Sequence, residues 1–204
     1  MKAVVFDLDG TLVDSTLDIA TAVNTTLAED GLGPLPPEQI GSFTGFGAGE
    51  LIRRAFAAAG GAAADGATAR YLAHYEEHPA DRTTVFRDAG EALPALRERG
   101  LKIAVCTNKE TELSRTVLRA LGLEDAVDAI VGADSVPRIK PDPAHVLAAL
   151  EAVGAAPSEA VYVGDSDVDA EAAAAAGVRC LLVEWGRARA PGPERIGRFS
   201  ELVP

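Results

Sequence analysis

The sequence is poor in cysteine and in aromatic side chains. Its 204 residues include 2 cysteines, and aromatic residues make up 5% of the chain. Cys106 lies inside an apolar run and Cys180 follows Gly177-Val-Arg, so we expect both to be core residues and not partners in a disulfide. This cysteine usage fits a reducing compartment.

Basic residues and long apolar runs are also scarce. The chain has 19 Lys and Arg against 31 Asp and Glu, which gives a formal net charge of -12 and a pI near 4.7. Binding to a phosphate backbone requires a basic face, so we expect no nucleic-acid partner. No apolar run approaches the ~18 residues of a membrane span, and no basic-then-apolar leader precedes the first predicted strand. We therefore expect a cytoplasmic protein with no membrane partner, and 48% apolar residues are enough to fill a core.

A short apolar run followed at once by acidic residues is the strongest local pattern. Residues 3–6 predict a strand buried on both faces, because the run does not alternate with polar residues. Asp7 and Asp9 would then leave the same face of the strand's end, and Gly10 would let the backbone turn. Two such carboxylates indicate acid/base chemistry or a site for a hard cation. A helix N-cap would use the same residue types, because Asp, Thr and Ser satisfy free backbone N–H groups.

Helices and strands alternate from about residue 88 onward. The pattern predicts helices over 91–99, 111–121, 143–153 and 168–176, and strands over 101–106, 129–131, 160–163 and 178–183. Such alternation implies right-handed crossovers and a parallel sheet with helices on both faces. We therefore predict a Rossmann-like α/β core domain made of residues 1–14 and 85–204.

Residues 15–84 break this rhythm. Helical patterns cover 16–30, 37–40, 51–59 and 71–78, with no convincing strand, and the alanine and glycine stretch 57–69 predicts a loop between helices. The glycine-dense loop 41–50 lacks the preceding strand of a dinucleotide fingerprint, so we expect its N–H groups to face a small anion or the loop to be a mobile turn. We predict a small all-helical domain inserted after the first strand.

One zinc-protease pattern occurs in this segment. His74 and His78 form His-x-x-Glu-His, with Glu77 between them, and both histidines would share a helix face. Pro79 ends that helix at once, and solvated His and Glu are common on helix surfaces. We interpret the match as accidental.

Polar clusters follow three of the strands, where ligands bind in an open parallel sheet, and a fourth cluster between them puts Lys140 at the start of a helix. They are Asp7-x-Asp9, Thr107-Asn-Lys109, Arg138-Ile-Lys-Pro-Asp-Pro143 and Gly164-Asp-Ser-Asp-Val-Asp169. Each alone could be a turn, a helix cap or a solvated charge. Together they supply acceptors for a cation, donors for an anion and a fixed positive charge.

In this order the four clusters resemble the motifs of the haloacid dehalogenase superfamily of phosphohydrolases, over essentially the whole chain. The helical insertion is similar to the small cap domain of that superfamily. Within it, the chain most resembles phosphoglycolate phosphatases, through Asp14-Ser-x-x-Asp-Ile-Ala-x-Ala-Val-Asn24, Gly45-x-Gly47, Thr107-Asn-Lys109 and Val183-x-Trp-Gly186. It departs from them at 85–89, which lacks their Pro-Gly turn, and at Arg187, where many carry an aromatic residue.

The resemblance implies a role for each acidic residue. Asp7 would be the nucleophile, already ionised at its ordinary pKa of ~3.9. Asp9 would protonate the leaving oxygen and later take a proton from water, which requires a pKa well above that of Asp7. Mg²⁺ would be held by the Asp7 side chain, the Asp9 carbonyl and Asp165. Asp169 would orient Lys140 or the waters of the metal, and Asp167 would be solvated.

The resemblance also implies the anion site and the substrate. Lys140, the Thr107 hydroxyl and the N–H groups of Asn108 and Gly10 would hold the phosphoryl oxygens.

The expected substrate is a small phosphorylated metabolite, most specifically 2-phosphoglycolate. The loop with Gly45 and Gly47 would offer backbone N–H donors to its carboxylate, and the side chain of Arg53 or Arg54 would assist in binding it. Asp9 argues against a dehalogenase, because halide leaves without a proton. A β-phosphoglucomutase, a pyrophosphatase and a nucleotidase remain alternatives, as does a non-enzymatic module that binds phosphometabolites. The protein would be a monomer or a homodimer.

Overall fold

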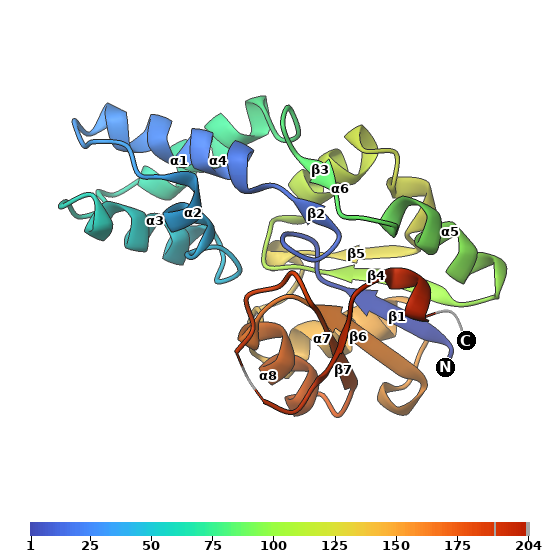
Figure 1. The fold of residues 1–204 in the computed structure, drawn as a ribbon. Helices are drawn as coiled ribbons and strands as arrows, with labels where there is room; N and C mark the ends of the chain where they lie inside the picture. Colours follow the sequence, from blue (N-terminus) through green and yellow to red (C-terminus); the bar gives the residue numbers. More distant parts are fainter. Residues whose placement is uncertain (190, 203–204) are drawn as a thin grey trace.

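A six-stranded parallel sheet forms the centre of the protein (Figure 1). The structure is a computed structural model, and it describes residues 1–189 and 191–202. The strand order of the sheet is β5-β4-β1-β6-β7-β8, and every neighbouring pair is parallel. The strands are β1 (Ala3–Phe6), β4 (Lys102–Cys106), β5 (Ala129–Val131), β6 (Ala160–Gly164), β7 (Arg179–Val183) and β8 (Glu194–Ile196). The predicted parallel sheet is confirmed, with β8 as an additional edge strand.

Helices cover both faces of the sheet. Val4 and Phe6 of β1 pack into one apolar cluster with α5 (Ala89–Glu98) and α6 (Thr111–Ala120). Ala3 and Val5 point the other way, into a cluster with α7 (Pro143–Ala152) and α8 (Asp167–Ala175). Because neighbouring side chains of a strand alternate between faces, a strand buried on both sides reads as a continuous apolar run. Short 3₁₀ helices complete the core at η1 (Glu124–Ala126), η2 (Ala133–Ser135), η3 (Pro157–Glu159) and η4 (Phe199–Leu202).

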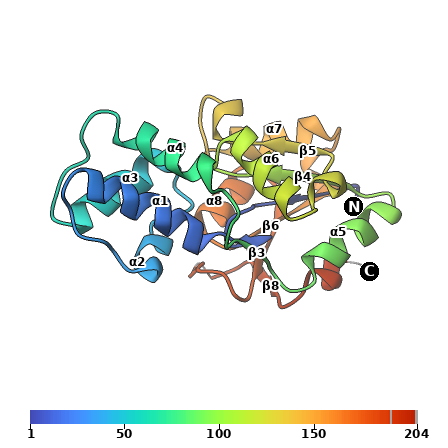
Figure 2. The same ribbon diagram turned by 90° about the horizontal axis from the view of Figure 1, so that it is seen from above.

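The insertion is a separate group of helices beside the sheet, as Figures 1 and 2 show from two directions. It consists of α1 (Thr16–Glu29), α2 (Pro37–Gly41), α3 (Ala48–Ala58) and α4 (Ala67–Glu77), which share their own apolar cluster. The loop predicted over 57–69 is too long at both ends, because α3 runs to Ala58 and α4 begins at Ala67. Alanine favours helix strongly but adds little to an apolar pattern, so a packing signal misses it.

Two short strands connect the insertion to the sheet. β2 (Val13–Asp14) pairs antiparallel with β3 (Thr84–Val85), so the chain leaves and returns through one narrow ribbon. The expectation of no strand up to residue 84 is wrong at Thr84, since a two-residue strand is too short to show periodicity. Next to this connection in sequence, buried Asp18 of α1 accepts hydrogen bonds from the Arg82 N–H (2.9 Å) and the Thr83 hydroxyl (2.7 Å).

The two cysteines do not form a disulfide. Cys106 is buried, Cys180 is half-buried, and both are free thiols. None of the helices in the described part of the chain combines the length and the apolar character needed to cross a membrane.

Candidate active site

The carboxyl ends of the central strands bring three of the predicted polar clusters together. Phe6 of β1 is level with Val105 of β4 and with Val163 of β6. Asp7, Thr107 and Asp165 therefore follow their strands at neighbouring positions on one edge of the sheet. Carboxylate oxygens of Asp7, Asp165 and Asp169 lie within 4.8 Å of one another. The sheet thus gathers acidic side chains that are far apart in sequence.

Lys140 lies between two of these carboxylates. Its Nζ donates to Asp7 Oδ1 (2.8 Å), to Asp169 Oδ1 (2.7 Å) and to the Tyr162 hydroxyl (2.8 Å). The side chain is buried, and Lys140 precedes the N-terminal turn of α7. A buried ammonium stays charged only when paired, and here all three of its donors have partners. Lys140 consequently fixes Asp7 Oδ1 in place and leaves Oδ2 for other contacts.

Asp169 is fully engaged by hydrogen bonds. Its Oδ1 accepts from Lys140 and from the Tyr162 hydroxyl, and its Oδ2 accepts from the Asp165 N–H and from the N–H and hydroxyl of Ser166. The Ser166 contacts also form the capping box that begins α8. The motif therefore caps α8 and also contributes Asp169 to the site. Asp169 has no spare lone pair facing outward and serves to hold Lys140 and Asp165.

Asp165 carries the observation that points to a cation. Its Oδ1 is buried and has no hydrogen-bond partner among the described residues, whereas its Oδ2 accepts from Arg187 Nε at 3.0 Å. Gly10, at φ +87°, lies so close that a Cβ there would stand 2.7 Å from Asp165 Oδ2. A buried carboxylate oxygen without a donor is costly unless a cation satisfies it. Asp7 and Asp165 therefore fit a hard divalent ion such as Mg²⁺, which prefers oxygen ligands.

Burial and charge change the pKa values of these acids. Burial raises the pKa of Asp7 to about 7, and it raises the pKa of Asp165 to about 6. Burial also opposes ionisation of Asp169, but the Lys140 ammonium outweighs it and holds the pKa of Asp169 below its ordinary value. The sequence-based expectation that Asp7 keeps its ordinary pKa is therefore wrong for the protein without a cation, because burial was not visible in the sequence.

Asp9 lies apart from the three clustered acids and is held by different partners. Its Oδ1 accepts from the Ser15 hydroxyl (2.5 Å) and from Lys109 Nζ (2.6 Å). The two carboxylates predicted to share one volume are thus each paired with their own lysine. Ser15 precedes α1 but makes no side-chain cap, and Asp14 instead accepts from the Thr16 N–H at 3.1 Å. Asp14 thus satisfies the first N–H of α1, whereas the Ser15 hydroxyl is bound to Asp9.

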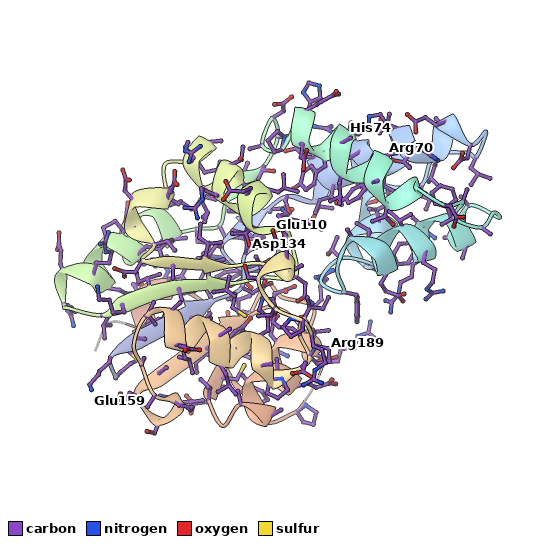
Figure 3. All side chains as sticks on the ribbon, turned by 180° about the vertical axis from the view of Figure 1, so that it is seen from behind. Arg70, His74, Glu110, Asp134, Glu159 and Arg189 are labelled. Atoms are coloured by element: carbon purple, nitrogen blue, oxygen red, sulfur yellow. The ribbon has the colours of Figure 1, made fainter. Side chains whose placement is uncertain are left out.

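A small cavity of about 40 Å³ lies between the sheet edge and the insertion. The core contributes Asp7, Asp9 and the residues that follow β4, among them Glu110, which Figure 3 shows on the side of the core that faces the insertion. The insertion contributes Gly45, Gly47 and the rings of Tyr71 and Tyr75. The two carboxylates with roles in the expected chemistry thus open into one cavity, which the insertion covers.

The comparisons with known proteins agree with this geometry. Residues 4–183 match the model of a family described as haloacid dehalogenase-like hydrolases. The chain belongs to this family.

Two relatives of this hydrolase are named phosphoglycolate phosphatase. The one from Cereibacter sphaeroides is 47% identical over 98% of this chain and 94% of the relative, and the one from Rhodospirillum rubrum is 43% identical over 93% and 82%. The crystal structure of a predicted phosphoglycolate phosphatase from Haemophilus somnus superposes with a TM-score of 0.92. It is 28% identical and covers 99% of this chain and 96% of its own.

Asn108 of this haloacid dehalogenase-like hydrolase ties three segments together with its side chain. Its Nδ2 donates to the carbonyls of Gly45 and Lys140, both at 2.9 Å, and its Oδ1 accepts from the Lys140 N–H at 3.0 Å. From the sequence, only the backbone N–H of Asn108 is expected at the site. Thr107 Oγ1 is buried beside it and accepts from the Lys109 N–H at 3.3 Å.

Several predicted residues do not reach the site of this hydrolase. Arg53 and Arg54 both pair with Glu50 on α3, at 2.6 Å, and neither lines the cavity. His74 pairs with Glu29, and His78 pairs with Asp81. Figure 3 shows His74 and Arg70 together on α4 of the insertion. In the described part of the chain, the group of acids that could hold a metal is Asp7, Asp165 and Asp169.

Four contributors to the site of the hydrolase received no role from the sequence. They are Ser15, Tyr75, Tyr162 and Arg187. Each reaches the site through a contact that depends on how the insertion or a strand is placed in three dimensions. A partial signal existed for Arg187, at which the sequence departs from the expected resemblance to phosphoglycolate phosphatases.

Proposed function

We propose that the protein is a Mg²⁺-dependent phosphatase of small phosphomonoesters that forms an aspartyl-phosphate intermediate, with 2-phosphoglycolate as its substrate. Two features of Asp7, which Lys140 holds, carry this proposal. Its carboxylate lies within 4.8 Å of that of Asp165, which has a buried oxygen without a partner among the described residues, and it opens into one cavity with the second carboxylate, Asp9. The names of the relatives support the substrate.

In the first half of the reaction Asp7 acts as the nucleophile. Lys140 fixes Asp7 Oδ1, so Oδ2 forms the new bond to phosphorus while the bond between phosphorus and the ester oxygen breaks. Asp9 gives its proton to the departing oxygen, which leaves as the hydroxyl of glycolate. Ser15 and Lys109 both hold Asp9 Oδ1, which leaves Oδ2 as the atom that carries the proton.

In the second half Asp9 acts as a base. It takes a proton from a water molecule, whose oxygen attacks the phosphorus of the aspartyl-phosphate and releases inorganic phosphate and the Asp7 carboxylate.

The Thr107 hydroxyl and the Asn108 N–H would hold the phosphoryl oxygens through both halves. Lys140 and the Gly10 N–H, which the sequence also suggested for this role, are used elsewhere: all three Lys140 donors have protein partners, and the Gly10 N–H donates to the Val13 carbonyl at 2.8 Å.

The Asp7 and Asp165 side chains and the Asp9 carbonyl would hold the metal ion. When bound, Mg²⁺ offsets the repulsion between a phosphate dianion and the carboxylates. Asp169 acts on the site through Lys140 and through the Asp165 N–H, which it holds in position.

We assign residues 15–84 to a cap domain and residues 1–14 and 85–204 to the core domain. The β2–β3 ribbon is the proposed hinge, because it carries both connections. Closure of the cap would exclude water from the cavity, whose roof includes Gly45 and Gly47.

Phosphate release from 2-phosphoglycolate tests the proposal. We expect release with Mg²⁺, loss of release with a chelator, and loss of release in Asp7→Asn. The matched control is Asp65→Asn, which changes an exposed aspartate on a loop of the insertion. An Asp7→Asn variant with full activity would refute the nucleophile.

A panel of phosphate compounds tests the substrate. Faster turnover of pyrophosphate, of a nucleotide or of another ester would reject 2-phosphoglycolate, as would conversion of glucose-1-phosphate to glucose-6-phosphate without phosphate release. Turnover ratios report how well each transition state is bound.

A further inference from the structure

Lys109 is a buried cation at the junction between the core and the insertion. Its Nζ donates to Asp9 Oδ1 at 2.6 Å and to the hydroxyl of Tyr75 on α4 at 2.7 Å. The side chain of Lys109 is 5% exposed, and Tyr75 is fully buried. Burying the charge of a lysine costs free energy, so its position between a core carboxylate and a tyrosine of the insertion suggests a function.

The ammonium of Lys109 has capacity for one more partner. An ammonium carries three N–H donors, and the described contacts with Asp9 and Tyr75 use two of them. Lys109 lines the cavity, so an anion bound there can accept from the third donor. Among the described residues that line this cavity, Lys109 is the only cation, while Asp7, Asp9 and Glu110 are acidic. An anion that enters the cavity beyond the phosphoryl site can therefore pair only with Lys109.

The chemistry of the ester places its carboxylate near this ammonium. In 2-phosphoglycolate one carbon separates the carboxylate from the ester oxygen, which is the atom that Asp9 would protonate. Lys109 contacts Asp9 directly, so a carboxylate next to the ester carbon lies within reach of its free donor. The arginines of the insertion do not compete for this role, because Arg53 and Arg54 both pair with Glu50 outside the cavity.

We propose that Lys109, positioned by Tyr75, binds the carboxylate of the substrate and thereby selects phosphomonoesters that carry an acid next to the ester carbon. This inference rests on the proposed phosphatase function and adds the residue that determines its specificity. Tyr75 is a positioning residue in this scheme, since it acts through Lys109. Because Tyr75 belongs to α4, the carboxylate site is complete only when the insertion covers the sheet edge.

A matched pair of esters tests the inference. 2-Phosphoglycolate and 2-hydroxyethyl phosphate have the same chain length and differ in the carboxylate alone. We expect the wild-type protein to prefer 2-phosphoglycolate in kcat/KM, and Lys109→Met to reduce that preference at least ~30-fold, the size of a charge-assisted hydrogen bond. The ratio is the diagnostic quantity, because Lys109 also touches Asp9 and its loss slows both esters.

Two further variants keep the test independent of folding. Tyr75→Phe removes one hydroxyl and keeps the charge, so we expect the preference to fall by a smaller factor of about three. Arg54→Met removes a cation of the insertion that lies outside the cavity, and we expect it to keep the wild-type ratio. Thermal melts show whether each variant is folded.

Product inhibition provides a readout that does not depend on the leaving group. We expect Lys109→Met to weaken inhibition by glycolate at least ~tenfold and to leave inhibition by inorganic phosphate unchanged, since phosphate occupies the Asp7 side of the site. A folded Lys109→Met variant that keeps the wild-type preference and the wild-type glycolate inhibition overturns the inference while the phosphatase function stands. A wild-type protein that releases phosphate from neither ester overturns the proposed function itself.

Discussion

Arg187 joins Asp165 of the core to Thr44 of the insertion. Its Nε donates to Asp165 Oδ2 at 3.0 Å, and its Nη1 donates to the Thr44 hydroxyl at 2.7 Å and to the Gly41 carbonyl. One guanidinium thus contacts both a candidate metal ligand and the loop that covers the cavity. The position of the loop and the charge near the cation site are therefore linked through a single side chain.

The charge of Arg187 opposes a cation at Asp165. In the wild-type protein the Arg187 charge weakens binding of the ion by ~1 kcal/mol. We therefore expect Arg187→Ala, which removes this charge, to tighten Mg²⁺ binding about fivefold. Isothermal titration calorimetry at about pH 8 measures the affinity, since Asp165, with a pKa of about 6, is then ionised.

The matched control for this prediction is Arg187→Lys, which retains the charge. It should bind Mg²⁺ close to the wild-type affinity. Unchanged or weaker binding in Arg187→Ala would show that Arg187 acts by orienting Asp165 and not by repelling the ion.

Among the described side chains, Lys140 is the one that forms a hydrogen bond with the Asp7 carboxylate. Removing one member of a buried ion pair leaves an uncompensated charge, so we expect Lys140→Met to lower the free energy of unfolding by ~3–5 kcal/mol and to reduce kcat by at least ~100-fold. Urea unfolding and phosphate release measure the two effects. Lys102→Met, at an exposed ion pair with Asp128, should change the free energy of unfolding by less than ~1 kcal/mol. A Lys140→Met variant as stable as Lys102→Met would contradict this account.

The sequence could predict the sheet and the acidic edge because both depend on local pattern. The run 3–6 reads as a buried strand, and Asp7 and Asp165 stand directly after strands whose ends the parallel sheet aligns. The partners from the insertion could not be predicted in this way. Tyr75 is 34 residues from Lys109, and Thr44 is 143 residues from Arg187, so both contacts depend on how the insertion sits on the core. The raised pKa of Asp7 likewise follows from burial, which no motif reports.

The buried carboxylate of Asp7 makes stability depend on pH. Burial raises its pKa from 3.8 to about 7, so between these values the folded protein holds a proton that the unfolded chain has released. Stability therefore falls as the pH rises through this window, because the folded state binds more protons than the unfolded state. Asp7→Asn removes this penalty and keeps an oxygen for Lys140.

We accordingly expect Asp7→Asn to melt higher than the wild-type protein at about pH 8 in the presence of a chelator, by roughly 2–4 °C per kcal/mol gained. The difference should shrink as the pH falls below 3.8, where both states hold the proton. Thermal melts across the range measure it. A lower melting temperature for Asp7→Asn at about pH 8 would mean that the ionised carboxylate stabilises the site without metal.

Gly10 tests whether the space beside Asp165 matters for the cation. Its φ of +87° disfavours any side chain, and a Cβ would lie 2.7 Å from Asp165 Oδ2, so Gly10→Ala must displace the carboxylate. We expect Mg²⁺ affinity, measured by calorimetry, to fall at least ~tenfold, as it does when groups that orient metal ligands are changed.

A substitution at Gly31 is the control for backbone strain. It has a similar φ of +71°, yet no atom lies within 4 Å of its added Cβ, and it follows α1 far from Asp165 in sequence. Gly31→Ala should therefore lose ~1 kcal/mol of stability and bind Mg²⁺ as the wild-type protein does. Equal loss of affinity in both variants would attribute the effect to the backbone, whereas loss in Gly10→Ala alone identifies the contact with Asp165 as the cause.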